Sequence, residues 1–340
     1  MTLPRTIVPV SDDEAIARIE RDVALLWPKA ARTGPLGLAV SGGPDSLALL
    51  LLAHAALPGE IAVASVDHGL REEAASEVAL VGEICAALDV PFTPLKVEIS
   101  QGNLQARARE ARYQALGEWA EKRELGALAT AHHADDQAET LLMRLSRGSG
   151  LAGLAGVRAS SHVPGHEDVL LIRPLLGWRK AELQEIVASA GITPALDPSN
   201  QDPSFDRVRV REHLAEHQWL DPKQLAQSAS NLGEAWLALQ WFAEIDWEDM
   251  VHRDPNGQMT ITYYANVPRA IAVETIMRIV GELGGMVSRA EAGRAFDRLW
   301  QGENASLGGV LAIPGIEKLD KIGVDMRAWR FSPEPPRAVH

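Results

Sequence analysis

The chain has 340 residues, of which 46% are hydrophobic, 23% charged and 5% aromatic. These proportions are typical of a globular protein and exclude a disordered or fibrous chain. The length is sufficient for two domains, each with a core of its own. Cys85 is the only cysteine, which excludes an intramolecular disulfide and a zinc site built from several cysteines, and favours a reducing compartment.

The formal net charge is −13, and an acidic chain is a poor general partner for nucleic acid, although a local basic surface can still bind phosphates. Residues 1–22 carry acidic side chains where a signal peptide needs a basic segment and an apolar run. The longest apolar run, residues 47–57, contains His54 and is shorter than the roughly 20 residues of a membrane span. We therefore expect a cytoplasmic protein without membrane contacts.

Short apolar runs alternate with helical patterns over the first half of the chain. The apolar runs have the length of strands and lie at residues 36–40, 61–66, 91–97, 127–131 and 170–175. The helical patterns lie at residues 15–30, 46–56, 74–88, 104–124, 135–146 and 180–190. This alternation predicts an α/β fold, a doubly wound, Rossmann-like parallel sheet with helices on both faces.

The pattern changes after residue 215. Helical patterns follow at residues 222–247, 269–284 and 289–300, with one strand-like run at 259–263. We therefore predict a first domain over residues 1–215, a second, mainly helical domain over 216–330 and a flexible proline-rich tail over 331–340.

Three of the predicted strands end in polar segments. These segments are SGGPDS at residues 41–46, DHGLR at 67–71 and HHADDQAE at 132–139. In a doubly wound sheet, ligands bind in the crevice at the carboxyl ends of the strands. We expect the three segments to face one crevice, with Asp67 and His68 directly after the second predicted strand. A plain Asp-His-Gly turn without ligand contacts is the alternative for these two residues.

The first segment is typical of an anion site. It consists of Ser41, Gly42, Gly43, Pro44, Asp45 and Ser46. Its glycines let backbone N–H groups turn toward a ligand, and the following helix adds its N-terminal dipole. The two serine hydroxyls can donate to phosphate oxygens and Asp45 can hold Mg²⁺, although the segment matches neither GxxxxGK[ST] nor GxGxxG. A simple helix-capping turn is the alternative.

The third segment concentrates titratable groups. Asp136 and Glu139 are three residues apart, so both carboxylates can lie on one helical face beside His133. The alternative is a well-capped helix start whose acids complement the helix dipole.

Several arginines are candidate ligands for anions. Arg109 and Arg112 share a face of the helix predicted at 104–124, and Arg147 begins a glycine-rich stretch. Arg207, Arg209 and Arg211 follow Asp197-Pro198-Ser199-Asn200 and are the best candidates for phosphate contacts. An extended backbone would place these last three on one side, whereas a helix would spread them. The alternatives are solvated or paired surface arginines for Arg109 and Arg112, a plain linker for the stretch that begins at Arg147, and a simple turn at residues 197–200, which would not account for the three arginines after it.

The order of these segments resembles a known family. SGGPDS resembles the SGGxDS loop of the N-type ATP pyrophosphatases, the PP-loop superfamily. Together with DHGLR, NLQARAREARYQAL, AHHADDQAETLLMRLSRGSGLAGLAG and the run from RPLLGW to VREHL, it resembles the catalytic domain of the tRNA(Ile)-lysidine synthase family. The matching pieces span residues 41–214 in the order of that family.

The resemblance implies an ATP-dependent, Mg²⁺-assisted ligase. In that family the carbonyl oxygen at carbon 2 of the wobble cytidine of tRNA(Ile) with a CAU anticodon attacks the α-phosphate of ATP. Free L-lysine then displaces AMP and leaves lysidine. No obligatory protein partner is implied, and the second domain would dock the tRNA.

The resemblance also implies roles for individual residues. Asp136 and Glu139 would hold the lysine, and one of them or His133 would act as the base. Arg109 and Arg112 would touch the lysine carboxylate or the nucleotide, and the sequence leaves open which arginine contacts which ligand. The predicted catalytic group is Asp45, Arg112, His133, Asp136 and Glu139; the predicted ATP site is residues 41–46 with Asp67 and His68; and Arg147, Arg207, Arg209 and Arg211 are predicted to contact lysine or tRNA.

Other classes of protein remain as alternatives. An amide-forming synthetase of the superfamily would need a source of ammonia, and nothing in the sequence resembles a glutaminase domain. A tRNA thiolase would need cysteines near the crevice, whereas Cys85 lies in an apolar helical pattern and is predicted to be buried. A regulatory module that only binds nucleotide gives no reason for the titratable groups at residues 132–139.

Overall fold

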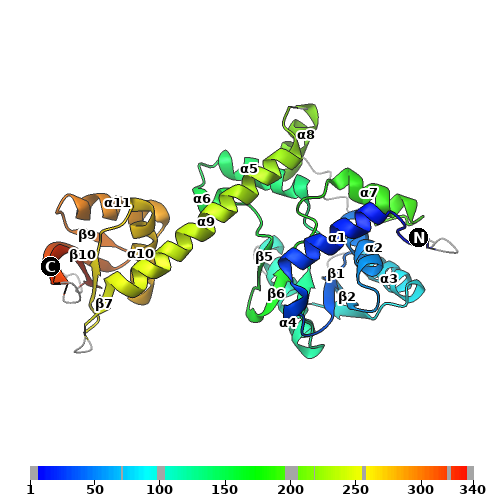
Figure 1. Cartoon of the computed structure of the whole chain (residues 1–340), viewed down its shortest axis with the longest axis horizontal. Helices are drawn as coiled ribbons and strands as arrows, with labels where there is room; N and C mark the ends of the chain where they lie inside the picture. Colours follow the sequence, from blue (N-terminus) through cyan, green and yellow to red (C-terminus); the bar gives the residue numbers. More distant parts are fainter. Residues whose placement is uncertain are drawn as a thin grey trace. The chain divides into compact units, whose positions relative to one another are not determined.

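The computed structural model describes residues 7–69, 72–97, 104–195, 206–217, 219–254, 258–319 and 323–334. The chain forms two compact units, Met1–Gly233 and Glu234–His340 (Figure 1). The first unit therefore extends beyond the predicted boundary at residue 215. The reason is that residues at the start of the following helix bind the first unit: Arg179 pairs with Asp221 at 3.2 Å, and Lys223 pairs with Glu182 at 3.3 Å.

The first unit is built on a six-stranded sheet with the order β3-β2-β1-β4-β6-β5. Its strands are β1 (Leu36–Ala39), β2 (Ile61–Asp67), β3 (Phe92–Lys96), β4 (Ala127–Ala129), β5 (Ser160–Val163) and β6 (His166–Ile172). All neighbours pair in parallel except β5, which runs antiparallel to β6. The mainly parallel sheet is thus confirmed, and the antiparallel edge strand is an addition that the sequence reading missed.

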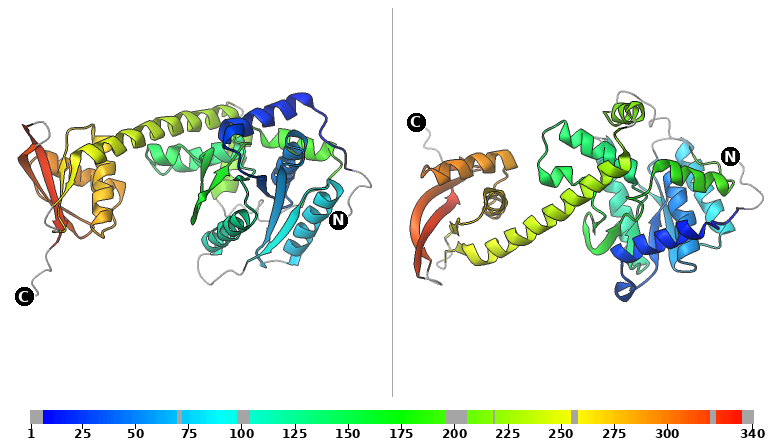
Figure 2. Two further views of the ribbon diagram at one scale, coloured as in Figure 1. Left: turned by 60° about the horizontal axis from the view of Figure 1, so that its bottom comes forward. Right: turned by 45° about the horizontal axis from the view of Figure 1, so that its top comes forward.

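Helices cover both faces of this sheet (Figure 2). They are α1 (Asp13–Leu26), α2 (Pro44–Ala56), α3 (Glu72–Ala87), α4 (Leu104–Lys122), α5 (Ala134–Leu145), α6 (Leu151–Leu154), α7 (Lys180–Ser189) and α8 (Asp206–Glu216). Because side chains alternate along a strand, neighbouring residues belong to different cores. Leu36 and Leu38 pack with α1, α2, α3 and α7, whereas Leu128 and Leu171 pack with Tyr113 and its neighbours on α4.

The strand order creates a switch point between β1 and β4. The chain passes from β1 outward to β2 and β3 and then returns to β4 on the other side of β1. The loops after β1 and β4 therefore diverge and leave a crevice at the carboxyl ends of these strands, where doubly wound folds bind their ligands.

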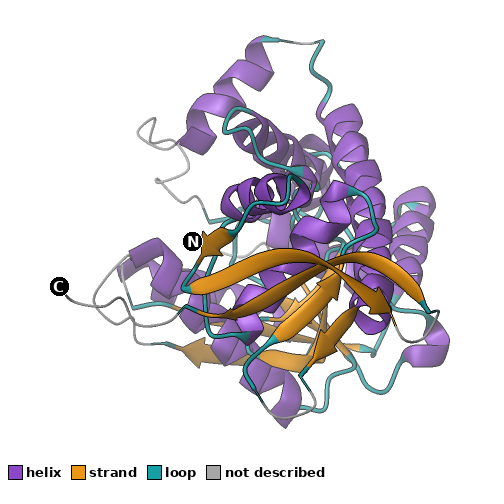
Figure 3. Cartoon of the chain, turned by 90° about the vertical axis from the view of Figure 1, so that its left-hand side faces the viewer, coloured by secondary structure: helices purple, strands orange, loops and turns teal. Residues whose placement is uncertain are grey.

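The second unit combines helices with an antiparallel sheet of the order β7-β8-β11-β10-β9. Its elements are α9 (Pro222–Met250, which begins in the first unit), β7 (Val251–Arg253), β8 (Ile261–Tyr264), α10 (Arg269–Glu282), α11 (Arg289–Trp300), β9 (Ala305–Leu307), β10 (Val310–Leu319) and β11 (Val324–Pro333). The long, twisted strands are drawn in orange in Figure 3.

The prediction of a mainly helical second domain missed β10 and β11. Pro314 and Gly315 interrupt the apolar pattern of β10, yet both residues pair with β11. The buried rings of Trp329 and Phe331 hold β11 on the core of this unit. The predicted tail is also wrong at its start, because β11 continues to Pro333; residues 335–340 lie outside the described residues.

No helix among the described residues is both long and apolar enough to cross a membrane.

Cys85 provides a test of the first core. It lies in α3 with 0% exposure, and burial raises the pKa of its thiol to about 12. We expect no reaction with a thiol reagent in the native protein at pH 8 and one equivalent of reaction after unfolding in guanidinium chloride, because only the thiolate is the nucleophile. Rapid reaction of the native protein would contradict the burial of this side chain.

Candidate active site

A cavity of about 450 Å³ lies at the switch point of the first sheet. Its lining includes polar residues at the ends of β1, β2 and β4 and from four helices. They are Ser41, Asp45 and Ser46 after β1, Ser65 and His68 at β2, Thr130 and His132 after β4, and Glu77, Arg112, Asp136 and Arg207 from α3, α4, α5 and α8. Gly43 and Pro44 also line it, whereas Gly42, Asp67, Arg109, His133 and Glu139 do not.

The loop after β1 leaves the first turn of α2 open to a ligand. Gly42 has φ +84°, a left-handed conformation that favours glycine, and Pro44 occupies the first turn of α2. No side chain caps α2, whereas Asp12 caps α1 with two hydrogen bonds. The backbone N–H groups at the start of α2 are therefore available to an anion.

Ser46 has a different role from the one expected. Its hydroxyl accepts a hydrogen bond from the Ser41 N–H at 3.1 Å and donates to the Gly43 carbonyl at 3.0 Å. Both of these partners belong to the loop, so the buried Ser46 side chain closes the turn. Ser41 is exposed, and its hydroxyl lies 3.2 Å from the Ser46 hydroxyl, so it would leave this contact to donate to a ligand.

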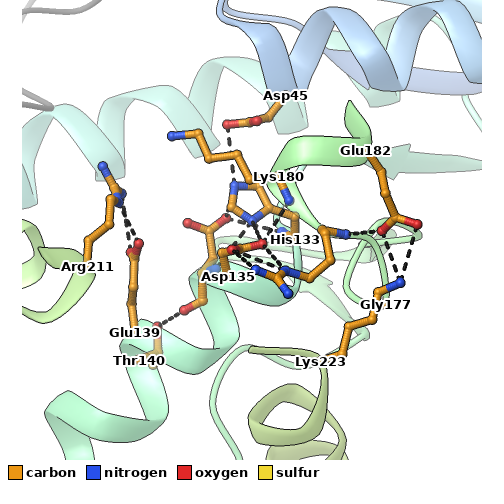
Figure 4. A network of polar contacts seen from close by, with 12 residues as sticks. Asp45, His133, Asp135, Glu139, Thr140, Gly177, Lys180, Glu182, Arg211 and Lys223 are labelled. Carbon is orange, nitrogen blue, oxygen red and sulfur yellow. Dashed lines mark hydrogen bonds and ion pairs between the residues drawn. The ribbon is translucent and has the colours of Figure 1, made fainter. Parts of the chain in front are cut away.

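His133 connects the loop after β1 with the start of α5. Its Nε2 atom lies 3.4 Å from Asp45 Oδ2, and its Nδ1 atom accepts a hydrogen bond from the Asp136 N–H at 3.3 Å (Figure 4). Asp136 Oδ2 in turn accepts from the His133 N–H at 3.1 Å, which completes a capping box. Burial alone would lower the pKa of His133, but Asp45, Asp136 and Asp135 outweigh it and raise that pKa.

The two aspartates of this arrangement differ in their partners. Burial alone would raise the pKa of Asp136, but His133 and Arg207 lower it, so Asp136 is ionised at neutral pH. Asp45 Oδ1 is shielded from solvent and has no hydrogen-bond partner among the described residues. Asp45 therefore presents an unsatisfied carboxylate oxygen at the edge of the cavity.

The acidic residues of α5 are paired with arginines of α8. Arg207 donates to Glu139 at 2.6 Å and to Asp136 at 2.9 Å, and Arg211 donates to Glu139 at 2.7 Å. Because residues 206–216 form a helix, Arg207 and Arg211 lie four positions apart on one face, and Arg209 instead pairs with Asp206.

Of the predicted residues Arg147, Asp67 and His68, only His68 lines the cavity. Arg147 is exposed and also pairs with Asp206, at 2.7 Å. The segment 197–200 lies outside the described residues. Asp67 accepts a hydrogen bond from the Gly69 N–H at 2.8 Å, as an ordinary turn residue does, whereas His68 lines the cavity.

A cationic cluster forms another wall of the cavity. Arg112 lines the cavity, and burial lowers the pKa of its guanidinium. Within the described ranges no carboxylate pairs with Arg112, so it is suited to bind an anion. Arg109 is exposed and stacks on the Tyr113 ring at 5.0 Å from the ring centroid. Of the two arginines, only Arg112 is placed to meet a ligand.

Thr130 and His132 line the same cavity, and Arg173 lies close enough to His132 to affect its pKa; the sequence analysis assigned no individual role to any of the three. Burial lowers the pKa of His132 to about 4, with Arg173 and Arg112 contributing, and its Nδ1 atom lies 3.0 Å from Thr130 Oγ1. Arg173 follows β6 directly and donates to the Arg158 carbonyl at 2.7 Å. The position after a strand was the available signal, but the predicted strand at 170–175 extended past Arg173 and hid it.

His132 predicts a pH dependence of stability. The imidazole protonates near pH 6.5 in the unfolded chain but only near pH 4 in the folded protein. The unfolded state therefore binds more protons between these values, and the free energy of unfolding falls as the pH falls through them. We expect the free energy of unfolding of the native protein, measured with urea, to fall between pH 7 and pH 4 by on the order of 3 kcal/mol more than that of His132→Gln. An equal loss in both proteins would contradict the burial of a neutral imidazole.

Comparison with known proteins identifies the family. Residues 17–218 match the PP-loop domain family. The chain is 45% identical over 310 residues to the tRNA(Ile)-lysidine synthase of Novosphingobium aromaticivorans, a match that covers 91% of this chain and 92% of the relative. It is 38% identical over 310 residues to the tRNA(Ile)-lysidine synthase of Zymomonas mobilis, with 90% of each covered.

A solved structure supports the fold. The U34-tRNA thiolase of Methanococcus maripaludis superposes with a TM-score of 0.51 at 17% identity, over 65% of this chain and 79% of the thiolase. At this identity the likeness concerns the fold alone. The sequence comparisons confirm the resemblance carried by the SGGPDS loop and the segments that follow it: the chain belongs to the tRNA(Ile)-lysidine synthase family, and its first unit contains the PP-loop domain.

Proposed function

We propose that the chain joins L-lysine to carbon 2 of the wobble cytidine of tRNA(Ile) with a CAU anticodon, with ATP as the energy source. The observation that carries the proposal is the single cavity in which the open start of α2, Asp45, Arg112 and Asp136 meet. The relatives from Novosphingobium and Zymomonas, both tRNA(Ile)-lysidine synthases, support the choice of tRNA and reaction. A location in the cytoplasm and the absence of an obligatory protein partner remain expectations.

The first step needs stabilisation of charge on the phosphates of ATP. The base oxygen forms a bond to the α-phosphorus while the bond to pyrophosphate breaks, and negative charge grows on the leaving group. The N–H groups at the start of α2, the Ser41 hydroxyl and the Arg112 guanidinium are the donors that face this charge. His68 lies at the neighbouring strand end, where the adenosine part would lie.

Asp45 fits a Mg²⁺ site. Its buried Oδ1 atom lacks a hydrogen-bond partner among the described residues, and a carboxylate oxygen is a ligand that Mg²⁺ prefers. The ion would supply neutralisation of phosphate charge. His133 holds the other oxygen of Asp45 at 3.4 Å and so orients this carboxylate toward the phosphates.

The second step needs recognition of an ammonium group. The ε-nitrogen of lysine forms a bond to carbon 2, the bond to the AMP oxygen breaks, and the nitrogen loses protons. Asp136 is ionised, lines the cavity and lies on the same helix face as Glu139, so these two carboxylates are suited to bind the ammonium. His133 has both ring nitrogens engaged by Asp45 and by the backbone of α5, which favours an orienting role over that of the base.

Asp45→Asn tests the phosphate site. The amide cannot supply the negative charge that binds Mg²⁺, so we expect AMP release with tRNA(Ile) and lysine to fall by about 100-fold or more. The matched control is Asp13→Asn on α1, outside the cavity lining, which should leave AMP release unchanged. Loss of activity in both variants would indicate a general effect on folding, and full activity of Asp45→Asn would contradict the proposed site.

Omission of single substrates distinguishes this proposal from the alternatives. We expect AMP release to require tRNA(Ile) and to rise with lysine, measured with unmodified tRNA transcripts. AMP release that is indifferent to tRNA would instead indicate a synthetase for a small molecule.

A further inference from the structure

Glu139 is a buried acid held by two arginines. Its side chain is 1% exposed, and its two carboxylate oxygens accept from Arg211 Nε at 2.7 Å and Arg207 Nε at 2.6 Å (Figure 4 shows the Arg211 contact). Arg207 also pairs with Asp136, at 2.9 Å. The carboxylates that are suited to bind a lysine ammonium are thus already neutralised by cations of the same chain.

The arginines are the more accessible members of this group. The Arg207 and Arg211 side chains are 44% and 34% exposed, and both project from α8. Arg207 lines the nucleotide cavity, whereas Arg211 lines a separate pocket with Asp135 and Arg179. Guanidinium groups bind phosphate bidentately, so a phosphate that approaches this surface competes with Glu139 for them.

We propose that Arg207 and Arg211 are specificity-determining residues that control lysine binding by an exchange of partners. In this exchange, which rests on the proposed function, phosphate groups of the other substrates take the two arginines and release Glu139 and Asp136 for the lysine ammonium. No covalent bond changes, and each charge keeps a partner of opposite sign before and after the exchange.

The burial of Glu139 makes the two events interdependent. A buried carboxylate without a cation is strongly destabilised, so the arginines leave readily only when another cation arrives. Lysine likewise reaches Glu139 only when a phosphate accepts the arginines. Linkage then requires that phosphate ligands raise the affinity for lysine and that lysine raises theirs by the same factor.

The source of the phosphate is either the nucleotide or the tRNA backbone. The position of Arg207 at the nucleotide cavity favours ATP for that residue, and the separate pocket of Arg211 favours the tRNA backbone. Binding of labelled lysine to the native protein distinguishes them. The four arms are no addition, α,β-methylene ATP with Mg²⁺, tRNA(Ile) transcript, and both together.

We expect lysine to bind about tenfold more tightly in at least one phosphate arm than with no addition, within the usual range of coupling between sites. Enhancement by the ATP analogue alone assigns the exchange to the nucleotide, and enhancement only with tRNA assigns it to the backbone. Equal lysine affinity in all four arms, with an enzyme that incorporates lysine in turnover, overturns the exchange. Failure to bind lysine in all four arms, together with no incorporation of lysine in turnover with ATP and tRNA(Ile), overturns the proposed function as well.

Variants of α8 provide the matched comparison. Arg211→Gln should bind lysine more tightly without additions and lose most of the enhancement, whereas Arg211→Lys should retain part of it. Arg32→Gln removes a cation of the first unit that pairs with Glu60 and lines neither the nucleotide cavity nor the pocket of Arg211, and its lysine binding should match that of the native protein. Lysine binding by Arg211→Gln that equals the native value in every arm would overturn the role of Arg211. If that variant does not fold, the four lysine-binding measurements on the native protein still test the exchange.

Discussion

The contact between His133 and Asp45 is the interaction on which the site depends. Asp45 belongs to the loop after β1 and His133 to the loop after β4, so their contact at 3.4 Å spans the switch point of the sheet. The same imidazole caps α5 through Asp136. One buried side chain therefore sets the position of Asp45, the carboxylate proposed to face the phosphates, relative to Asp136, the carboxylate proposed to face the ammonium group, and the parallel sheet supplies the rigid frame for both.

Charge compensation is the second constraint. The chain carries a net charge of −13, yet its substrates are a polyanionic RNA and a nucleotide. The site supplies positive charge locally. Arg112 and Arg207 line the cavity, and Arg173 lies near His132, which also lines it. Asp136 and Glu139 pair with Arg207 in the free protein, and the proposed exchange replaces these pairs, whereas Arg112 has no carboxylate partner among the described residues.

The sequence predicts most of the first unit because its central strands β1, β2 and β4 are mostly buried apolar runs and its helices have clear starts. It fails where the signal is tertiary. Pro314 and Gly315 look like breakers, and only their pairing with β11 reveals a strand. From the sequence we predicted Asp136, Glu139 and Arg207 as separate substrate ligands. Sequence patterns do not reveal that α8 packs against α5 and brings these charges together. The sequence assigned no individual role to His132, because its lowered pKa comes from burial and from neighbouring cations, and none to Arg173, because the predicted strand at 170–175 extended past this residue.

Analysis of the tRNA product tests the central claim most directly. Unmodified tRNA(Ile) with a CAU anticodon would be incubated with the protein, ATP, Mg²⁺ and isotopically labelled lysine, digested to nucleosides and examined by mass spectrometry. The account predicts a single new nucleoside, in which the wobble cytidine carries the labelled lysine. Consumption of ATP with an unchanged wobble cytidine, or label at any other nucleoside, would contradict it.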